Sequence, residues 1–385
     1  MKRLSWIGIL IAASWLASCT SSSVPGPPTG QPAPGSSPTP GPAPPMALNL
    51  QSGFKITMIS TQVPGARFMT FAPNGDLIVA ETGNGKVVAI KQGAPVDSTP
   101  TVIASGLSLP HGLAFSGNDL YIATWTGLSV LRNYPSGTTV QTLYSGLAQN
   151  SDHNRRALAI SSNGTVFESS GSDCNICAEG DPKLATVMTM DLNGQNAAIY
   201  AKGIRNGSGL TFDQSGQLWM TVNQRDDLTP DHTNLPVDEF DKLVSGGDYG
   251  WPQCYPDLNG DRQPNPDSPA PNPSCAGQVK TTVPLQAHSA PLGVTFYNGS
   301  MFPASFKGGA FIAYHGSWDR QPPTGYKIVF VPFNGGVPAA PADFVWGWLT
   351  TTGSYTGRPV GLAVAPDGSL YISDDYNGYI YRVTY

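Results

Sequence analysis

Residues 361–373 read GLAVAPDGSLYIS, two runs of alternating apolar and polar residues on either side of an Asp-Gly pair. An Asp-Gly or Asn-Gly pair flanked by such alternation is the strongest short signal for a β-hairpin. The pattern recurs five more times, so the repeat rather than any single hairpin determines the fold. The other copies are residues 69–81, 112–124, 157–169 and 209–222, and residues 293–314 with a longer turn.

The six copies predict an all-β fold, a six-bladed β-propeller over residues 49–385. Equivalent apolar positions in successive copies lie 44 to 84 residues apart, and the shorter spacings suit a four-stranded blade of ~40–50 residues. The longer spacings indicate insertions at 226–287 and 332–357. We expect residues 54–59 to complete the last blade and close the ring, which leaves no open sheet edge. A β-sandwich or two stacked β domains is the alternative architecture.

The composition argues against two classes of protein. Charged residues make up 12% of the 385 residues, and the net charge is −5; typical globular domains hold ~25% charged residues. A chain with so few cations cannot neutralise a run of phosphates, so we expect no nucleic-acid partner. No apolar run of ~18 residues follows the N-terminal region, so the sequence predicts no transmembrane helix.

The first 48 residues have the composition of export and spacer segments. A charged start and a short apolar stretch end at LASC, residues 16–19, the layout of a signal peptide over residues 1–19. It resembles the bacterial lipoprotein signal, in which the cysteine, here Cys19, is lipidated; an ordinary secretory signal is the alternative. Residues 20–48 hold ten prolines and predict a disordered, semi-rigid linker. We therefore expect an exported protein, held to a bacterial membrane by a lipid anchor only, facing the periplasm or the cell exterior.

Four cysteines follow Cys19, an even number that favours disulfide bonds in an oxidising compartment. The natural pairs are Cys174–Cys177 and Cys254–Cys275, because each closes a short loop. The Cys-x-x-Cys spacing also occurs in zinc sites. Neither a second Cys-x-x-Cys nor a close pair of histidines completes such a site, so the sequence favours two disulfides over zinc.

Polar residues gather just before or after the repeat copies, at positions that surround the central channel of a propeller. These clusters are Leu109–His111, Asp152–Arg156, Arg205-Asn206, Asn223–Asp227, His315–Arg320 and Gly357–Pro359. In a chain with so few charged residues, a gathering of arginines and histidines at one end of the ring is not expected from solvent exposure alone. Guanidinium groups bind carboxylates through paired hydrogen bonds, so the pattern predicts a polyanionic ligand in the channel.

Eight stretches carry a resemblance to a known family. They are LPHGLAF (109–115), SDHNRRAL (151–158), GIRNGSGLTF (203–212), LWMTVNQRDDL (218–228), GGDYGWP (246–252), AHSAPLG (287–293), YHGSWDR (314–320) and GRPVGLAVAPDGSLYISDD (357–375). In this order they resemble the soluble sugar dehydrogenases that depend on pyrroloquinoline quinone (PQQ), in the sorbosone-dehydrogenase-like branch of the glucose/sorbosone dehydrogenase family. The resemblance implies a six-bladed, PQQ- and Ca²⁺-dependent oxidoreductase. Its substrate is an aldose or a sugar-derived aldehyde such as sorbosone, and its electrons go to a quinone or a cytochrome.

The resemblance also implies roles for individual residues. His153, beside Asp152, is the general base that takes the proton of the substrate hydroxyl while hydride passes to the quinone. Arg205 stabilises the anion that forms as the hydride arrives. Arg225 and Asp226 provide main-chain carbonyl ligands for Ca²⁺, and the Asp226 carboxylate is a possible further ligand. The implied cofactor contacts are Asn206, Asn223, Gln224, Arg225, His315, Trp318, Arg320 and Arg358, and His111 lies near a substrate-contact position.

Two other functions stay open. A six-bladed, calcium-dependent hydrolase of the lactonase type would draw on Asn206, Asn223, Asp226 and Asp374, although few glutamates lie at the channel ends. A non-catalytic binding propeller at the cell surface would keep the fold without using His153 as a base. We expect His288 to be structural, His232 to have no chemical role, and Asp374-Asp375 to form either a solvated turn or a second cation site.

Overall fold

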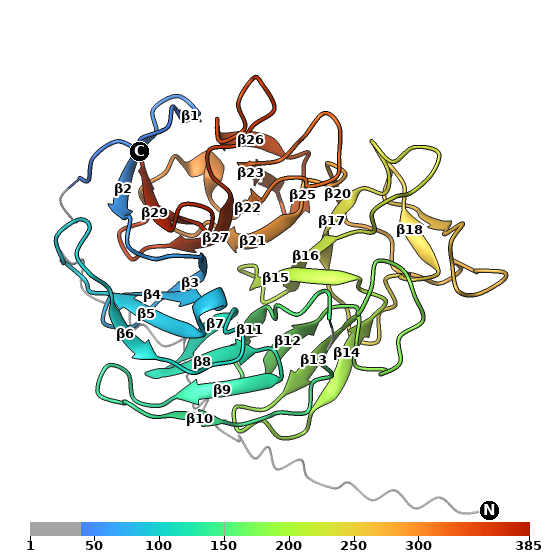
Figure 1. Ribbon diagram of the computed structural model, residues 1–385, viewed down its shortest axis with the longest axis horizontal. Helices are drawn as coiled ribbons and strands as arrows, with labels where there is room; N and C mark the ends of the chain where they lie inside the picture. The colour runs from blue at the N-terminus through green and yellow to red at the C-terminus, as the bar shows by residue number, and fades with distance from the viewer. Residues whose placement is uncertain (1–39, 150) are drawn as a thin grey trace, which may run out of the picture. The chain divides into compact units, whose positions relative to one another are not determined.

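The computed structural model describes residues 40–149 and 151–385, in which six antiparallel sheets surround a common centre (Figure 1). The predicted all-β, six-bladed propeller is therefore confirmed. The predicted signal peptide, Cys19 and most of the predicted linker lie outside the described residues. The described helices are two single 3₁₀ turns, Thr82–Asn84 and Ala304–Phe306, and none is long and apolar enough to cross a membrane.

Each blade is a sheet of at least four strands. The first blade holds β3 (Ala66–Phe71), β4 (Leu77–Glu81), β5 (Lys86–Ile90) and β6 (Thr101–Ala104), and the second holds β7 (Leu113–Ser116), β8 (Asp119–Thr124), β9 (Gly127–Leu131) and β10 (Val140–Thr142). The third holds β11 (Leu158–Ile160), β12 (Val166–Ser170), β13 (Thr186–Met190) and β14 (Ala198–Lys202). The fourth holds β15 (Asn206–Phe212), β16 (Leu218–Asn223), β17 (Asp238–Lys242) and β20 (Val283–Leu285). The fifth holds β21 (Pro291–Phe296), β22 (Ala310–Tyr314), β23 (Lys327–Val331), β26 (Ala342–Trp346) and the short β1 (Asn49–Leu50). The sixth holds β27 (Pro359–Val364), β28 (Leu370–Asp374), β29 (Tyr379–Thr384) and β2 (Lys55–Ser60).

The ring closes within the sixth blade, as the sequence predicts. Strand β2, from the N-terminal side of the ring, pairs with β29 near the C-terminus, and Met58 lies opposite Tyr381 in their register. The first strands of successive blades contact one another around the centre, from β3 through β7, β11, β15, β21 and β27 back to β3. Apolar side chains fill the spaces between neighbouring blades, so middle strands such as β4 and β28 are buried along their whole length.

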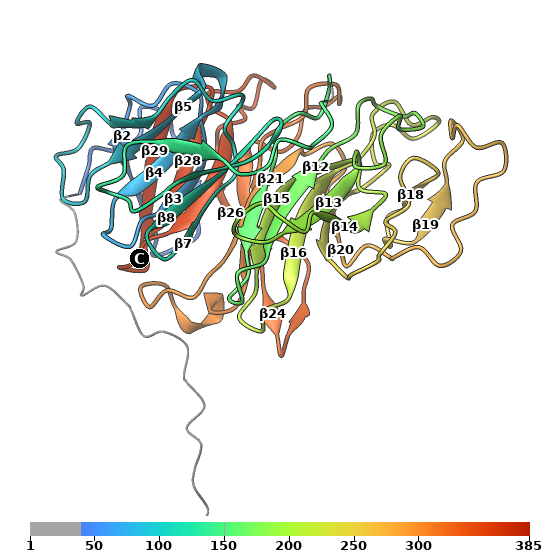
Figure 2. The same ribbon diagram turned by 90° about the horizontal axis from the view of Figure 1, so that it is seen from below.

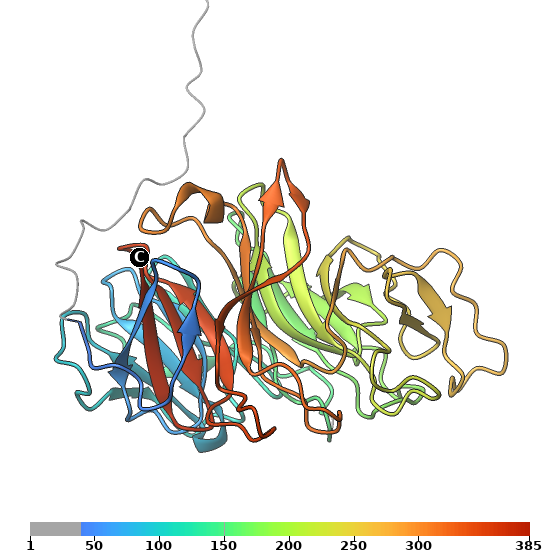
Figure 3. The same ribbon diagram turned by 90° about the horizontal axis from the view of Figure 1, so that it is seen from above.

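The two predicted insertions contain blade strands as well as additions to the ring. Residues 226–287 include β17 and β20, and they also hold the hairpin of β18 (Cys254–Pro256) and β19 (Arg262–Pro264), which extends from the rim (Figures 1 and 2). Residues 332–357 include β26 and the short hairpin of β24 (Phe333–Asn334) and β25 (Val337–Pro338), which projects from one face (Figure 3). Both predicted disulfides, Cys174–Cys177 and Cys254–Cys275, are present.

The antiparallel order of the strands explains where polar residues collect. In each blade the first strand begins where the second strand ends, because the two are joined by a hairpin. Arg205 and Arg358 immediately precede the first strands β15 and β27, Asn223 ends the second strand β16, and His315 follows the second strand β22. These ends all lie at one mouth of the central channel.

We predict that the closing strand β2 contributes to the stability of the whole ring. Met58 is 3% exposed and packs in the apolar cluster shared by the last two blades, so Met58→Ala should lower the free energy of unfolding by about 2–5 kcal/mol. Lys55→Ala, at an exposed position of the same strand, is the matched control and should change it by no more than about 0.5 kcal/mol. Urea unfolding measures both, and equal effects would contradict this role of β2.

Candidate functional site

A polar well opens at the centre of the ring and has two lobes. The lobes have volumes of about 460 and 350 Å³, which is within the usual range for small-molecule sites. They share Asp152, His153, Asn206, Asn223 and Ala290. The first, here called the acidic lobe, is completed by Asn175, Arg205, Gln224, Asp226, Asp227, Asp238, His288, Trp318 and Asp319. The second, here called the basic lobe, is completed by Arg67, His111, Asn154, Arg155, Ser208, Leu292, His315, Arg358 and Asp375.

His153 stands between the lobes with a defined tautomer. Its Nδ1 atom lies 3.1 Å from the carbonyl oxygen and 2.8 Å from the hydroxyl of Ser172, and that hydroxyl donates its own hydrogen to the carbonyl of Cys174. Nδ1 must therefore carry the ring hydrogen, and the basic lone pair is on Nε2. Nε2 lies 3.8 Å from the carboxylate of Asp152. Burial and the positive charge of Arg205 lower the pKa of His153 to about 3, so the imidazole is neutral at neutral pH.

A glycine allows the loop that carries His153 to approach the third blade. A side chain at Gly171 would place its Cβ 2.5 Å from the Cβ of His153 and 2.7 Å from its carbonyl oxygen. No side chain fits at that separation without displacing the His153 loop. The position of the imidazole therefore depends on a residue outside the predicted motif.

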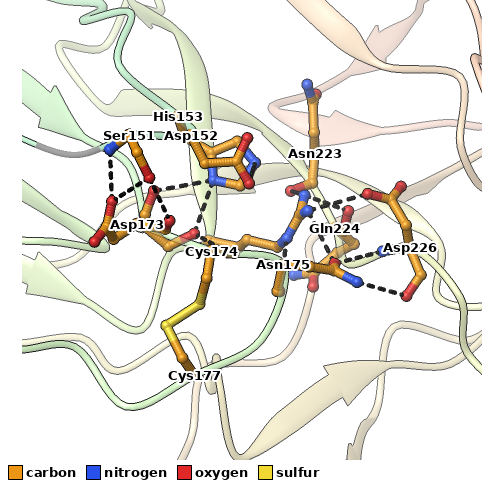
Figure 4. A network of polar contacts seen from close by, with 12 residues as sticks. Ser151, Asp152, His153, Asp173, Cys174, Asn175, Cys177, Asn223, Gln224 and Asp226 are labelled. Carbon is orange, nitrogen blue, oxygen red and sulfur yellow. Dashed lines mark hydrogen bonds and ion pairs between the residues drawn. A yellow bond between two sulfur atoms is a disulfide. The ribbon is translucent and has the colours of Figure 1, made fainter.

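Arg205 is held by Asn175 and by the residues at and just after the end of strand β16. Figure 4 shows these partners, Asn175, Asn223, Gln224 and Asp226, gathered at one place. Its Nε donates to the carbonyl of Asn175 at 3.1 Å, and its Nη2 donates to the Asn175 side chain at 3.0 Å and to the Asp226 carboxylate at 3.2 Å. Its Nη1 donates to the carbonyls of Gln224 at 2.7 Å and Asn223 at 3.4 Å. The five guanidinium hydrogens are thus used within the protein, and the side chain is only 4% exposed. Within the described residues no guanidinium hydrogen of Arg205 is left for a ligand, so the side chain borders the acidic lobe as a fixed positive charge.

The structure also changes the expected ligand at Asp226. Its carbonyl oxygen accepts hydrogen bonds from Arg225 Nε at 3.0 Å and from Asn175 Nδ2 at 3.3 Å, so this main-chain ligand is already engaged. The Asp226 side chain borders the acidic lobe instead. The Arg225 side chain does not line either lobe, because its Nη1 binds the side chains of Asn265 and Asp267 at 2.6 and 2.7 Å.

The basic lobe has a network that links four blades, the first, second, fifth and sixth. Arg67 donates through Nε to His111 Nε2 at 3.1 Å and through Nη1 to the Asp375 carboxylate, which also binds His315 Nε2 at 2.9 Å. Burial lowers the pKa of His315 to about 4, with Arg358 acting in the same direction against Asp375. Burial would raise the pKa of Asp375, but His315 and the nearby arginines hold it below its ordinary value. The lobe therefore has cationic arginines, neutral histidines and the carboxylate of Asp375, besides the carboxylate of Asp152 that it shares with the acidic lobe.

His111 is part of the wall of the basic lobe. Its Nδ1 lies 3.2 Å from the carbonyl of Arg156, and its Nε2 accepts the hydrogen bond from Arg67. Burial and the charge of Arg67 keep its pKa well below 6.5. Both ring nitrogens are thus used within the protein, which argues against the expected contact between His111 and a substrate.

The acidic lobe offers oxygen donors for a cation. Among the described residues, the buried Oδ1 of Asn223 has no hydrogen-bond partner, and Asn223 borders both lobes. The Asp226 and Asp238 carboxylates lie in the same lobe, where burial raises the pKa of Asp238 to about 7. His232, His288 and Asp319 form a second group whose ligand atoms lie within 4.8 Å of one another, so His288 borders the site rather than serving only the fold.

Most of the expected site residues converge, with two exceptions. His111, Asp152, His153, Arg205, Asn206, Asn223, Gln224, Asp226, His315, Trp318 and Arg358 all line the well, whereas Arg225 and Arg320 do not. Of the two alternatives for Asp374-Asp375, the solvated turn does not fit the structure, because Asp374 is fully buried and Asp375 is paired with Arg67 and His315, whereas the second cation site stays a prediction. Arg67 also lines the well but was not predicted from the sequence. A signal was present, because Arg67 lies four residues before Phe71, just as His111 lies four residues before the equivalent Phe115.

Comparisons with known proteins agree with this architecture. A family model described as TrAA12-like matches residues 48–385. A PQQ-dependent pyranose dehydrogenase of Coprinopsis cinerea is 26% identical over 89% of this chain, and this match covers 55% of that longer protein. A PQQ-dependent sugar dehydrogenase of Hypocrea jecorina is 27% identical over 86% of this chain and 87% of its own length. The structure of the holo PQQ domain of the Coprinopsis enzyme superposes with a TM-score of 0.77 at 24% identity, covering 90% of this chain and 98% of that domain.

We predict that His153 stays neutral well below the pH at which an ordinary histidine takes up a proton. Ring ¹⁵N spectra, assigned by comparison with His153→Gln, should show the same neutral tautomer, with hydrogen on Nδ1, at pH 7 and pH 5. An ordinary histidine would be mostly protonated at pH 5, because its pKa is about 6.5. A titration midpoint near 6.5 for His153 would contradict the buried, electropositive setting described above.

The lowered pKa of His153 also determines how this residue changes the free energy of unfolding with pH. Between pH 6.5 and about 3 the unfolded chain binds a proton at His153 and the folded chain does not, so this residue lowers the free energy of unfolding as the pH falls. From pH 7 to pH 5 the wild type should lose about 2 kcal/mol more than His153→Gln. Urea unfolding at the two pH values measures the difference, and equal losses would count against the prediction.

Proposed function

The chain belongs to the TrAA12-like family, and on that premise we propose that it is a PQQ- and Ca²⁺-dependent dehydrogenase of sugars. We propose that it oxidises the anomeric hydroxyl of an aldose, or a sugar-derived aldehyde of the sorbosone type. Two relatives, a PQQ-dependent pyranose dehydrogenase and a PQQ-dependent sugar dehydrogenase, support the reaction class. The observation that carries the proposal is a buried neutral imidazole, His153, that faces a well with a cluster of arginines on its other side.

The basic lobe fits a flat polycarboxylate such as PQQ. Arg67, Arg155 and Arg358 bring three positive charges to the lobe, and Asp375 is the single carboxylate that the lobe does not share. Arg67 is buried and paired with Asp375, Arg358 is partly buried, and Arg155 is exposed at the rim. The excess of positive charge beside a partly buried arginine favours a ligand with several carboxylates. His315 and Arg358, two of the expected cofactor contacts, would hold it there together with Arg67.

The acidic lobe fits a hard divalent cation. Asp226, Asp238 and the unpartnered Oδ1 of Asn223 are oxygen donors of the kind that Ca²⁺ binds. They adjoin the part of the well that both lobes share, so an ion held by them would lie beside a ligand in the basic lobe. We therefore propose side-chain oxygens, chiefly the Asp226 carboxylate, as calcium ligands in place of the expected carbonyl pair.

In this proposal the residues of the chain accept the substrate proton and stabilise the positive charge that then forms on His153. His153 Nε2 accepts the proton of the substrate hydroxyl, and Ser172 keeps the hydrogen on Nδ1 so that the lone pair of Nε2 stays free. Asp152, 3.8 Å away, stabilises the imidazolium that results. When bound, the quinone would supply the acceptor for the hydride, which carries both electrons, and Ca²⁺ would polarise the quinone carbonyl. An aldose leaves as the lactone, and the electrons pass later to an external acceptor.

Arg205 contributes a fixed positive charge. Because its five N–H groups are bound within the protein, its charge is held in place before the reaction begins. Such a preorganised charge stabilises negative charge that develops in a low-dielectric site. The same charge keeps the proton off His153 in the resting state.

We further propose that the protein is exported, lipid-anchored through Cys19 to a bacterial membrane, and active on its periplasmic or outer side. The two disulfides support an oxidising compartment. A quinone or a cytochrome would then take the electrons.

The calcium-dependent lactonase remains a second candidate, because Asp226, Asp227, Asp238 and Asp319 bring more carboxylates to the acidic lobe than the sequence suggests. Hydrolysis of lactones with Ca²⁺ and without quinone would favour that candidate.

We predict saturable binding of PQQ and sugar-dependent dye reduction by the purified protein once PQQ and Ca²⁺ are added. His153→Gln should lower kcat by about 10²–10⁴-fold, because it removes the base, and it should leave the absorbance spectrum of the bound quinone and the melting temperature close to those of the wild type. Saturable PQQ binding without oxidation of any of a broad panel of aldoses and sugar aldehydes would contradict the proposed function. Unchanged turnover in His153→Gln would contradict the role of the base.

We predict that Ca²⁺ stabilises the protein through Asp226. Calcium present at 100 times its dissociation constant should add about 2.7 kcal/mol to the free energy of unfolding, and chelation should remove this gain. Asp226→Asn should lose most of the effect, whereas Asp343→Asn, at an exposed carboxylate of β26, should keep it. Thermal unfolding with and without Ca²⁺ measures the difference, and an equal response of the two variants would exclude Asp226 as a ligand.

A further inference from the structure

The loop between β12 and β13, residues 171–185, contains the Cys174–Cys177 disulfide, which has no role in the reaction proposed above. We call it the cysteine loop. Its two cysteines are 3 residues apart in the sequence, whereas Cys254 and Cys275 are 21 apart. The stabilisation that comes from cross-linking the unfolded chain grows with the length of the closed loop. The Cys174–Cys177 bond therefore adds less to the stability of the whole fold, and its main effect is on the loop itself.

The cysteine loop fixes the imidazole of His153 through one carbonyl group. The carbonyl oxygen of Cys174 accepts the hydroxyl hydrogen of Ser172 at 2.8 Å, and the oxygen of that hydroxyl lies 2.8 Å from His153 Nδ1. Since the hydroxyl hydrogen is directed toward Cys174, the Ser172 oxygen accepts the hydrogen of Nδ1. The position of the Cys174 carbonyl thus helps to decide which ring nitrogen of His153 carries the hydrogen.

The next residue of the cysteine loop, Asn175, holds Arg205 and Asp226 in the acidic lobe. Its carbonyl oxygen accepts hydrogen bonds from Arg205 Nε at 3.1 Å and from Trp251 Nε1 at 3.2 Å. Its side-chain oxygen accepts from Arg205 Nη2 at 3.0 Å and from the Asp226 backbone N–H at 2.9 Å, and its side-chain nitrogen donates to the Asp226 carbonyl at 3.3 Å (Figure 4). One amide side chain therefore sets the spacing between the guanidinium group and the aspartate.

This spacing matters for a cation. Arg205 Nη2 divides its two hydrogens between Asn175 and the Asp226 carboxylate, which lies 3.2 Å away. Without the Asn175 side chain, the guanidinium group would turn toward Asp226 and form the paired hydrogen bonds that arginine makes with carboxylates. The carboxylate would then be neutralised by Arg205, and it would bind Ca²⁺ more weakly. Asn175 lies within the small ring that the disulfide closes, so the disulfide restricts the backbone at this residue.

We propose that the cysteine loop is a positioning element for the reaction, in which the Cys174–Cys177 disulfide holds the Cys174 carbonyl and Asn175 where the base and the cation site need them. The inference rests on the proposed dehydrogenase function and adds positioning residues to it. The disulfide stays intact during turnover, so the loop contributes geometry and no chemistry.

Ring ¹⁵N spectra of His153 test the first contact on the full-length protein at pH 7, without quinone. The wild type should show hydrogen on Nδ1 alone. In the double variant Cys174→Ala with Cys177→Ala, the carbonyl at position 174 is no longer held in place, and the Ser172 hydroxyl becomes able to donate to Nδ1. The spectra should then show both neutral tautomers. Asn193→Ala, at an exposed turn after β13, is the control and should keep the wild-type spectrum.

Calorimetric titration with Ca²⁺ tests the second contact on the same protein. Asn175→Ala and the double cysteine variant should each weaken Ca²⁺ binding by about tenfold, the usual size of an effect on a residue that orients a metal ligand. With quinone and Ca²⁺ at saturation, each should also lower kcat by about tenfold while the KM of the sugar stays within about twofold. Asn193→Ala should change none of these values.

These measurements separate this inference from the proposed function. If no sugar is oxidised, but the tautomer of His153 and the Ca²⁺ affinity still change in the variants, the proposed function fails and the role of the loop stands. If the variants lower only the melting temperature and leave the tautomer and the Ca²⁺ affinity as in the wild type, the loop is merely structural and the inference is refuted. Failure of the double cysteine variant to fold would also overturn the local role of the disulfide.

Discussion

The ion pair between Arg67 and Asp375 joins the first blade to the sixth at the point where the ring closes. The same two residues bind His111 and His315, so the contact between the first and sixth blades also lines the basic lobe. The hydroxyl of Ser373 strengthens this contact by donating to the Arg67 carbonyl. Arg67 and Asp375 meet only when the first and sixth blades are side by side, so the basic lobe is complete only in the closed ring.

The electrostatics of the well follow from burial as much as from the number of charges. Arg205 and Arg67 lie where few waters can screen them, and their fields act on nearby imidazoles. The histidines respond by remaining neutral, which removes their charge from the site and leaves lone pairs for chemistry or for structural contacts. In the acidic lobe, burial and then the neighbouring carboxylates raise the pKa of Asp226 and Asp238. Each lobe contains an ion pair, Arg205 with Asp226 in the acidic lobe and Arg67 with Asp375 in the basic lobe.

The sequence predicts the inner half of each blade well and the outer half poorly. Inner hairpins repeat because their side chains must fit the same space between blades, so alternation and turn residues recur. Outer strands such as β10 and β14 carry exposed residues that no neighbouring blade constrains. Strand β20 is separated from β17 of the same blade by a long insertion, which hides its place in the repeat. Contacts such as Arg67 with Asp375, separated by 308 residues, leave no local pattern. The family resemblance assigned Arg205 and Asp226 to one site, but it did not predict that Asn175 binds the guanidinium group of Arg205 and the backbone N–H of Asp226.

The order of strands in the last blade has a consequence for how the chain is made. Strand β29 lies between β28 and β2, so residues 379–384 form an interior strand rather than an edge. Strand β2 precedes β29 by more than 300 residues along the chain, so it is synthesised long before its partner and has no strand to pair with until then. The first five blades can form from segments that lie between these two strands, whereas the sixth blade needs both of them.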